Sequence, residues 1–313
     1  MTLILTLVTR YVVLQVSDRL VSRGSSPYDS MSNKSIVFLT RNALSVIGYS
    51  GHAYIDGAPT DHWLAEQFSE STLPLDFGMS VRGGKSAQPQ DLAHAIERVR
   101  KNLVTAYSKM GAPVAGQASQ HVIVASLRWK SNQIRPGLAQ IAKHDAVPGA
   151  FVTVNMPNEQ LRWTWDTNGL LVTPMYLFET PLGWLTDADR QDIHERLASC
   201  SSINECESVL VNAIRLVSQR APNQVGPDCM SIFIYNSQEP KLRIRYIPIV
   251  AYRHDLPIGG QMVGFPAAFT PWFVSGGLIQ QPQVIIGGIE GRVAGIPVQI
   301  EAPPLPPNPF VSF

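Results

Sequence analysis

The sequence contains little charge for its length. Charged residues make up 16% of the 313 residues, and the formal net charge is only +1, whereas soluble domains average roughly a quarter charged residues. Because no strong basic excess is present, we expect neither nucleic acid nor an anionic membrane surface as a partner. The hydrophobic fraction of 45% is enough to bury a sizeable core. A globular protein is therefore expected.

Cysteine is also scarce, and it lacks the spacing of metal or disulfide sites. The three cysteines, Cys200, Cys206 and Cys229, are odd in number and form no CxxC pair, so we expect reduced thiols in the core. His62 and His194 lie alone in predicted helices, which does not favour a metal centre. The sequence therefore predicts no disulfide, no metal and no cofactor.

Long hydrophobic runs are missing as well. No apolar run reaches the length needed to span a membrane. The apolar residues 2–8 are followed early by Arg10, with no basic region before them and no small-residue cleavage site after them. We expect a cytoplasmic protein without a membrane partner.

Hydrophobic periodicity predicts groups of strands that alternate with pairs of helices. Strands are predicted within residues 2–17 as a hairpin, and at 35–39, 43–48, 121–127, 150–154, 161–165, 230–235 and 242–246. Helices are predicted at residues 60–68, 91–109, 187–198 and 203–220, with Asp61 or Thr60 and Ser202 as caps. This segregation indicates the α+β class, and paired helices after each group of strands suit helices outside two packed sheets.

The composition changes near Pro257. Pairs of glycines and a run of prolines at residues 303–307 dominate from there on. We predict a main domain over residues 1–253, followed by an irregular or β-rich extension over residues 254–313 that ends in a proline-rich arm. Such an arm could dock on a neighbouring molecule or be disordered.

One glycine-rich segment, residues 78–86, has features of a phosphate-binding loop. Its two key glycines, Gly78 and Gly84, stand one residue too far apart, and no clear strand leads into it. We therefore expect a flexible loop and no bound nucleotide.

Thr2 is a candidate nucleophile. Once Met1 is removed, Thr2 would carry both a hydroxyl group and an α-amine, and the amine can act as the base that activates the hydroxyl. The ordinary pKa of an α-amine, about 7.7–8.0, suits that role near neutrality. Because very many proteins begin with Met-Thr, this feature alone does not predict catalysis.

The residues that follow Thr2 make the pattern more specific. Asp18 lies sixteen residues after Thr2 at the end of the predicted hairpin, and Lys34 lies thirty-two residues after Thr2. This spacing resembles the start of proteasome β-subunits and of the bacterial peptidase HslV, with this chain as a divergent, bacterial-type member. The resemblance implies a four-layer αββα sandwich of the N-terminal-nucleophile (Ntn) hydrolase type, here with a Gly/Pro-rich C-terminal extension.

The resemblance also implies roles for these side chains. The ammonium group of Lys34 would lie near Thr2 and favour loss of its hydroxyl proton, while Asp18 would pair with Lys34 and hold it charged.

A second set of residues would complete the site. Gly51 is expected to supply the backbone N–H group of the oxyanion hole, with Gly48 as the second choice. The family supports the amine through an Asp-x-x-Ser-Gly element late in the chain, and here only Gly226 matches it. Ser50 and Asn223 are the candidate substitutes.

The sequence thus predicts a threonine-type hydrolase that cleaves peptide or amide bonds, with no metal and no cofactor. A homo-oligomer, with a ring as one such assembly, is implied by the family resemblance. Two alternatives stay open: an amidase for small substrates, and a catalytically silent scaffold or assembly subunit of the same fold.

Overall fold

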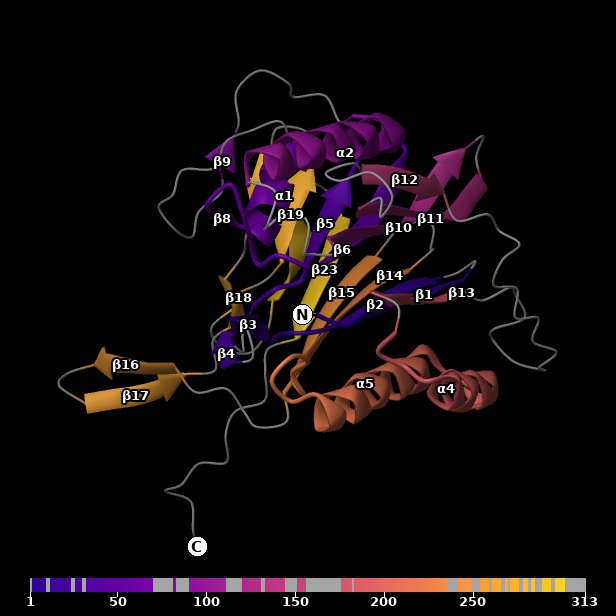
Figure 1. Ribbon diagram of the computed structural model, residues 1–313, viewed down its shortest axis with the longest axis vertical. Coiled ribbons are helices and arrows are strands. Elements are labelled where there is room, and N and C mark those ends of the chain that lie inside the picture. Colours follow the sequence, from indigo (N-terminus) through magenta and orange to yellow (C-terminus); the bar gives the residue numbers. More distant parts are fainter. Residues whose placement is uncertain are drawn as a thin grey trace, which may run out of the picture.

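The computed structural model describes two large sheets and the helices that pack on them (Figure 1). The described residues are 2–9, 12–23, 26–29, 32–69, 81–82, 90–110, 120–130, 133–143, 151–155, 176–181, 183–235, 241–248, 254–258, 261–265, 268–269, 271–275, 278–280, 283–284, 289–293 and 296–301. The predicted strand at 161–165, most of the glycine-rich loop at 78–86 and the proline-rich arm lie outside them.

The first sheet has seven described strands in the order β13-β1-β2-β14-β15-β23-β22. They are β1 (Ile4–Val8), β2 (Val12–Asp18), β13 (Tyr176–Thr180), β14 (Cys229–Tyr235), β15 (Lys241–Ile247), β22 (Ile289–Val293) and β23 (Ile296–Glu301). Every residue of β1 and β2 is buried, because both faces of this sheet are covered, and this explains their nearly continuous apolar sequence. The predicted N-terminal hairpin is confirmed.

The second sheet has eight described strands in the order β12-β11-β10-β6-β5-β19-β20-β9. They are β5 (Ser35–Leu39), β6 (Ala43–Ser50), β9 (Val81–Arg82), β10 (His121–Lys130), β11 (Gln133–Lys143), β12 (Phe151–Asn155), β19 (Trp272–Ser275) and β20 (Leu278–Gln280). The hairpin of β5 and β6 lies at its centre and carries the predicted lysine at its start.

Short hairpins accompany the sheets. They are β3 (Val21–Arg23) with β4 (Ser26–Asp29), β7 (Tyr54–Ile55) with β8 (Ala58–Pro59), β16 (His254–Ile258) with β17 (Gln261–Phe265), and β18 (Ala268–Phe269) with β21 (Gln283–Val284). The expectation of only four strands before the first helix was wrong, because β3, β4, β7 and β8 are too short to show a clear period.

The four described helices are α1 (Thr60–Ser69), α2 (Leu92–Lys109), α4 (Asp187–Ser199) and α5 (Ile203–Arg220). Each lies within one or two residues of its predicted range. Asp91 caps α2 and Ser202 caps α5 by accepting backbone N–H groups. None of the described helices combines the length and apolar character that crossing a lipid bilayer requires.

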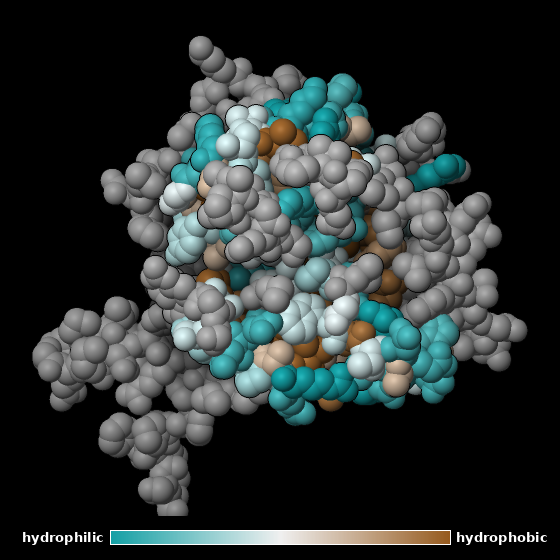
Figure 2. Space-filling view, viewed as in Figure 1, coloured by the Kyte–Doolittle hydropathy of each residue, from teal (hydrophilic) through white to brown (hydrophobic). Residues whose placement is uncertain are grey.

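The elements form layers around three apolar cores. In Figure 1, α1 and α2 lie over the eight-stranded sheet, while α4 and α5 lie over the far side of the seven-stranded sheet. The two sheets face each other through aliphatic residues that include Val13, Val37, Val46 and Ile232. Figure 2 shows a mainly hydrophilic surface over the outer helices at the upper and lower margins. The α+β class is confirmed.

Strands from the Gly/Pro-rich region join both sheets. β19 pairs in parallel with β5, and β23 pairs in parallel with β15. Glu301 of β23 accepts hydrogen bonds from Arg243 (2.6 Å) and Arg245 (2.7 Å) of β15, and Arg245 also contacts the buried carboxylate of Glu207 on α5. The division of the chain at residue 253 stays a prediction. Of the described strands beyond it, β19, β20, β22 and β23 are hydrogen-bonded into the two large sheets, while β16–β17 and β18–β21 form separate hairpins or pairs.

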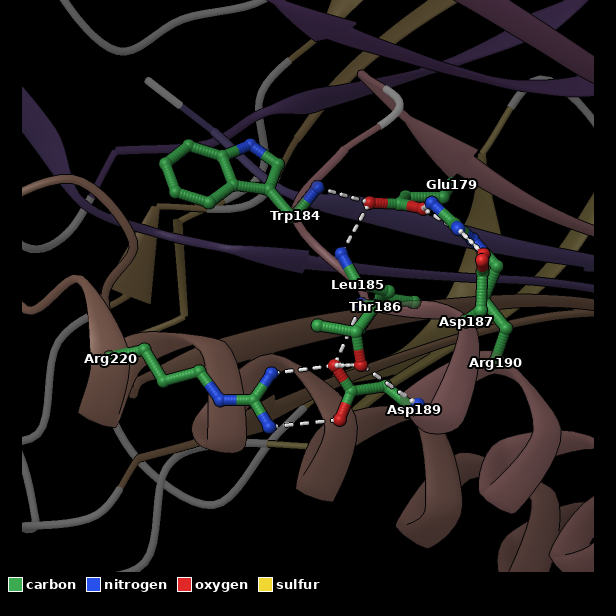
Figure 3. Close-up of polar contacts among 8 residues, drawn as sticks. All are labelled: Glu179, Trp184, Leu185, Thr186, Asp187, Asp189, Arg190 and Arg220. Carbon is green, nitrogen blue, oxygen red and sulfur yellow. Dashed lines mark hydrogen bonds and ion pairs between the residues drawn. The ribbon is translucent and has the colours of Figure 1, made fainter.

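A buried carboxylate fixes the segment that enters α4 (Figure 3). Glu179 of β13 accepts the N–H groups of Trp184 (2.6 Å) and Leu185 (2.8 Å) through Oε1. Its Oε2 pairs with Arg190 of α4 at 2.8 Å. The edge strand of the first sheet is thereby tied to its outer helix layer.

Asp189 then joins α4 to α5. Its carboxylate closes a capping box with Thr186 and accepts two hydrogen bonds from Arg220 of α5, at 2.5 and 2.9 Å (Figure 3). The hydrogen bonds from Arg220 hold the pKa of Asp189 well below its usual range. The two helices are thus linked by one charge-assisted contact.

We predict that Asp189→Asn lowers the free energy of unfolding by about 1–3 kcal/mol, because a charge-assisted contact and a cap are weakened. Since the pKa of Asp189 is depressed on folding, its stabilisation is present above about pH 4 and is lost as the pH falls further, so the difference should narrow in acid. Urea unfolding at pH 7 and pH 3 measures this. Asp187→Asn, which breaks an exposed pair with Arg190, is the control and should change stability by less than about 0.5 kcal/mol; equal effects would contradict the prediction.

Candidate active site

Asp18 lies at the centre of the candidate site. It is fully buried at the end of β2, and its carboxylate accepts three backbone N–H groups. Oδ1 accepts from Leu3 at 2.8 Å, and Oδ2 accepts from Leu20 and Gly226, both at 3.1 Å. The β1–β2 hairpin explains the first contact, because Asp18 N–H also donates to the Leu3 carbonyl at 3.2 Å.

Lys34 faces Asp18 from the other sheet. Lys34 is 2% exposed and directly precedes β5. Burial raises the pKa of Asp18 to about 6, while the positive charge of Lys34 and the three N–H donors act in the opposite direction. Packing of the sheets therefore brings the predicted carboxylate and the predicted ammonium group into electrostatic contact.

A further acidic residue, Asp61 in the first turn of α1, also faces Lys34. Burial raises the pKa of Asp61, and the charge of Lys34 again opposes the shift. The Nζ atom of Lys34 lies 5.9 Å from the centre of the Tyr49 ring. Sequence reasoning missed Asp61 as a site residue, because only the packing of α1 against β5 brings it near Lys34.

Thr2 is held between the two sheets. It is 3% exposed. The Oγ of Ser50, the last residue of β6, donates to the Thr2 carbonyl at 3.0 Å, and Asp18 holds the N–H group of the next residue, Leu3. Ser50 had been predicted to support the amine of Thr2, and the contact found is to its carbonyl. Both contacts fix the direction in which the chain enters β1.

The two candidate oxyanion glycines have different surroundings. Gly51 follows Ser50 at the end of β6 and has a φ of 130°, a conformation that favours glycine. Gly48 lies inside β6, paired with Ser35. A Cβ atom at Gly48 would lie 2.6 Å from Oε1 of Gln15, so a larger residue there would have to displace the end of the Gln15 side chain. The role of Gly51 in an oxyanion hole stays a prediction.

The turn before β14 contributes Gly226. Asn223 is exposed in that turn, and among the described residues no hydrogen bond joins it to Thr2 or Asp18. Gly226 instead donates to Asp18, and a Cβ atom there would lie 2.7 Å from the Cβ of Leu20. The sequence analysis named Gly226 because it matches the family pattern, but it did not predict the hydrogen bond from Gly226 to Asp18.

Two other groups near the site were considered for reactivity or metal binding. Cys229 pairs with Asp18 across β2 and β14, and burial raises the pKa of its thiol, which makes it a poor nucleophile at neutral pH. His62 lies 3.5 Å from Glu66, one turn later in α1, a neighbour that the sequence reasoning overlooked. Within the described ranges, no group of three or more His, Cys, Asp or Glu side chains is placed to hold a metal ion.

We predict that Asp18→Asn destabilises the fold, because an amide N–H2 group must then face a backbone N–H donor. Since folding raises the pKa of Asp18, the wild-type carboxyl contributes most below about pH 4, and this contribution, roughly 3 kcal/mol, is lost as the pH rises through about 6. Urea unfolding between pH 4 and 8 should show the gap between wild type and variant shrinking over that window.

The control for this experiment is Asp56→Asn. Asp56 is exposed and has a φ of 50°, which asparagine adopts readily. Its substitution removes an exposed ion pair with Lys109 (3.6 Å) and should change the stability by less than about 0.5 kcal/mol. A gap between wild type and Asp18→Asn that stays constant from pH 4 to 8 would show that Asp18 has no raised pKa.

No protein-family model and no curated protein matches this chain. Among solved structures, the chain is similar to a Gly-1 mutant of Anbu from Hyphomicrobium sp. strain MC1, with 12% identity, a TM-score of 0.46, and 80% of this chain and 88% of that chain covered. It is also similar to Anbu, an ancestral beta-subunit, from Yersinia bercovieri, with 8% identity, a TM-score of 0.43 and the same coverage. At these identities and scores the similarity establishes neither a family nor an activity.

Proposed function

We propose that this chain is a threonine-type N-terminal-nucleophile hydrolase that cleaves peptide or amide bonds, with Thr2 as nucleophile after Met1 is removed. One observation carries the proposal: the first residues are held in the structure by the same buried carboxylate that faces Lys34. Asp18 is fully buried and Lys34 is 2% exposed. Burying a carboxylate and an ammonium group is costly, and such groups concentrate at functional sites.

The reaction needs only groups of Thr2 and water. The α-amine takes the hydroxyl proton, and the oxygen attacks the substrate carbonyl to give a tetrahedral intermediate. As that intermediate collapses, the amine gives the proton to the leaving nitrogen, and an ester to Thr2 remains. Water, deprotonated by the same amine, then attacks the ester; the acid is released and the hydroxyl is restored. Lys34 would stabilise the negative charge that develops on the Thr2 oxygen.

Asp18 and Gly51 would complete the catalytic arrangement. Ionised Asp18 favours the charged state of Lys34 and at the same time holds the Leu3 N–H group that follows Thr2. Gly51, with Gly48 as the weaker candidate, would donate its N–H group to the oxyanion. Ser50 would position the Thr2 carbonyl, and Asn223 is the least supported of the residues proposed from the sequence.

The proposal extends to the architecture and the assembly. Helix pairs on the outer faces of two packed sheets support a four-layer αββα sandwich of the Ntn hydrolase type. A homo-oligomer, with a ring as one such assembly, follows from the family resemblance of Thr2, Asp18 and Lys34. In each subunit, the strands of the extension would widen both sheets, β19 and β20 beyond β5 and β23 and β22 beyond β15.

The burial of Thr2 favours two narrower functions. At 3% exposure, its hydroxyl suits a small amide better than a folded protein, as in an amidase. It also suits a silent scaffold, in which Met1 stays attached and the buried charges serve the fold. The amidase differs from a peptidase in the substrate that it accepts. The scaffold differs from both in that Met1 is retained.

A covalent labelling experiment tests the proposal. Wild type, Thr2→Ser, Thr2→Ala and Lys34→Met are treated with a peptide β-lactone, and the labelled residue and the retention of Met1 are read by mass spectrometry. We expect labelling of Thr2 in wild type and Thr2→Ser, none in Thr2→Ala, and a rate at least about 100-fold lower in Lys34→Met. The wild-type rate should fall as the pH drops through about 6, because Asp18 becomes protonated and no longer supports Lys34.

Each outcome has a distinct meaning. Equal labelling of all four proteins would end the catalytic proposal. Retained Met1 without labelling would support the scaffold. If Thr2 is labelled, turnover of small amides but not of unfolded peptides would select the amidase.

A further inference from the structure

A buried glutamine crosses the space between the two sheets beside the candidate site. Gln15 of β2 is 1% exposed. Its Nε2 donates to Thr6 Oγ1 at 3.2 Å within its own sheet, and its Oε1 accepts from Ser35 Oγ of β5, in the opposite sheet, at 2.7 Å. Both ends of the amide are therefore satisfied, one in each sheet.

Gly48 makes this crossing possible. Gly48 pairs with Ser35 in the β5–β6 hairpin. A Cβ atom at Gly48 would lie 2.6 Å from Oε1 of Gln15 and 3.0 Å from its Cδ. No such pair of atoms approaches so closely without a shift, so any larger residue would push the Gln15 side chain away from Ser35.

Apart from the hydrogen bond from Ser50 to the Thr2 carbonyl, the contacts between the sheets around Gln15 are mainly apolar. The core between the sheets consists largely of valine, isoleucine and leucine, and apolar contact does not fix one sliding position over another. A buried hydrogen bond does, because a shift by one residue would leave a polar group unpaired. Gln15 is thus suited to set the register of one sheet on the other.

This register matters for two charged residues. Ser35 directly follows Lys34, and Gln15 lies three residues before Asp18 on the same strand. We propose that Gln15 is a positioning residue that places Lys34 opposite Asp18, through its hydrogen bond to Ser35. The inference rests on the proposed function, because it assigns Gln15 to the same reaction.

The other groups that face the pair are not hydrogen-bonded to Gln15, whose side chain bonds Thr6 and Ser35. Asp18 is also faced by the three backbone N–H donors and by the thiol of Cys229 on β14. Lys34 is also faced by Asp61 from α1. A change in the titration of Asp18 upon substitution of Gln15 would therefore report the position of Lys34.

The test compares three substitutions in the full chain. Gln15→Met keeps the side-chain length and removes the hydrogen bonds, and Ser35→Ala removes the cross-sheet bond from its other end. Thr6→Val is the matched control, because it leaves the Gln15 amide short of one partner within its own sheet while the cross-sheet bond stays. The titration of Asp18 is followed by NMR of the ¹³C-labelled carboxyl group, and the labelling rate of Thr2 by mass spectrometry.

We expect the pKa of Asp18 to rise above its wild-type value in Gln15→Met and in Ser35→Ala, because Lys34 moves away, and to stay unchanged in Thr6→Val. The labelling rate should fall on the order of tenfold in the first two. The double variant Gln15→Met/Ser35→Ala should show the same pKa of Asp18 and the same labelling rate as the two single variants, since both substitutions remove the same cross-sheet bond. If Gln15→Met does not fold, Ser35→Ala, which deletes a single hydroxyl, tests the same bond.

An Asp18 titration identical in wild type and Ser35→Ala, or equally shifted in Thr6→Val, would overturn the inference and leave Gln15 a purely structural residue. Failure of the proposed function looks different: wild type would then not be labelled at all, whatever the titration of Asp18 in the variants.

Discussion

The carboxylate of Asp18 is the contact on which the N-terminal part of the fold depends. It receives N–H groups from the first residues of the chain, from the segment after β2 and from the turn before β14. Leu3 and Leu20 lie 15 and 2 residues from Asp18, whereas Gly226 lies 208 residues away. A buried carboxylate without donors would be strongly unfavourable. The positions of Thr2 and of the turn at Gly226 are therefore linked, and neither can move without leaving the other contact incomplete.

The same carboxylate makes Lys34 necessary. Three N–H donors offset part of the cost of burying a charge, but the raised pKa of Asp18 shows that burial still dominates. An ammonium group in the facing sheet reduces that cost, and Asp61 in turn faces the ammonium from α1. The charge of Lys34 thus acts on two carboxylates contributed by different layers. Such a group stabilises the fold little, since apolar residues would pack as well, and buried charges of this kind concentrate at functional sites.

The sequence predicted the elements well where a period extends over several turns or residues. The four helices followed from 3.6-residue spacing and Ser202 was predicted as a cap, whereas Asp91 had been placed inside the helix that it caps. The site proposed from the spacing of Thr2, Asp18 and Lys34 stays a prediction, although the charge of Lys34 does act on Asp18. Ser50, Gly226 and Gln15 were assigned other roles or none, because their contacts depend on how one sheet packs on the other. That packing is set by tertiary structure, and no local pattern records it. Gly48 illustrates the limit: the sequence offered it as the second choice for the oxyanion hole, and its close approach to the Gln15 side chain of the other sheet could not be predicted.

The position of β5, and with it that of Lys34, also depends on strands that lie beyond residue 254. β5, which begins directly after Lys34, would be an edge strand without β19, and edge strands shift and pair with other chains readily. With β19 on one side and β6 on the other, β5 is hydrogen-bonded along both edges. In the other sheet, β23 pairs with β15 in the same way. β15 is the neighbour of β14, which pairs with the Asp18 end of β2. The extension therefore restricts the two sheets at their edges, while Gln15 restricts them at their centre, and the position of Lys34 follows from both.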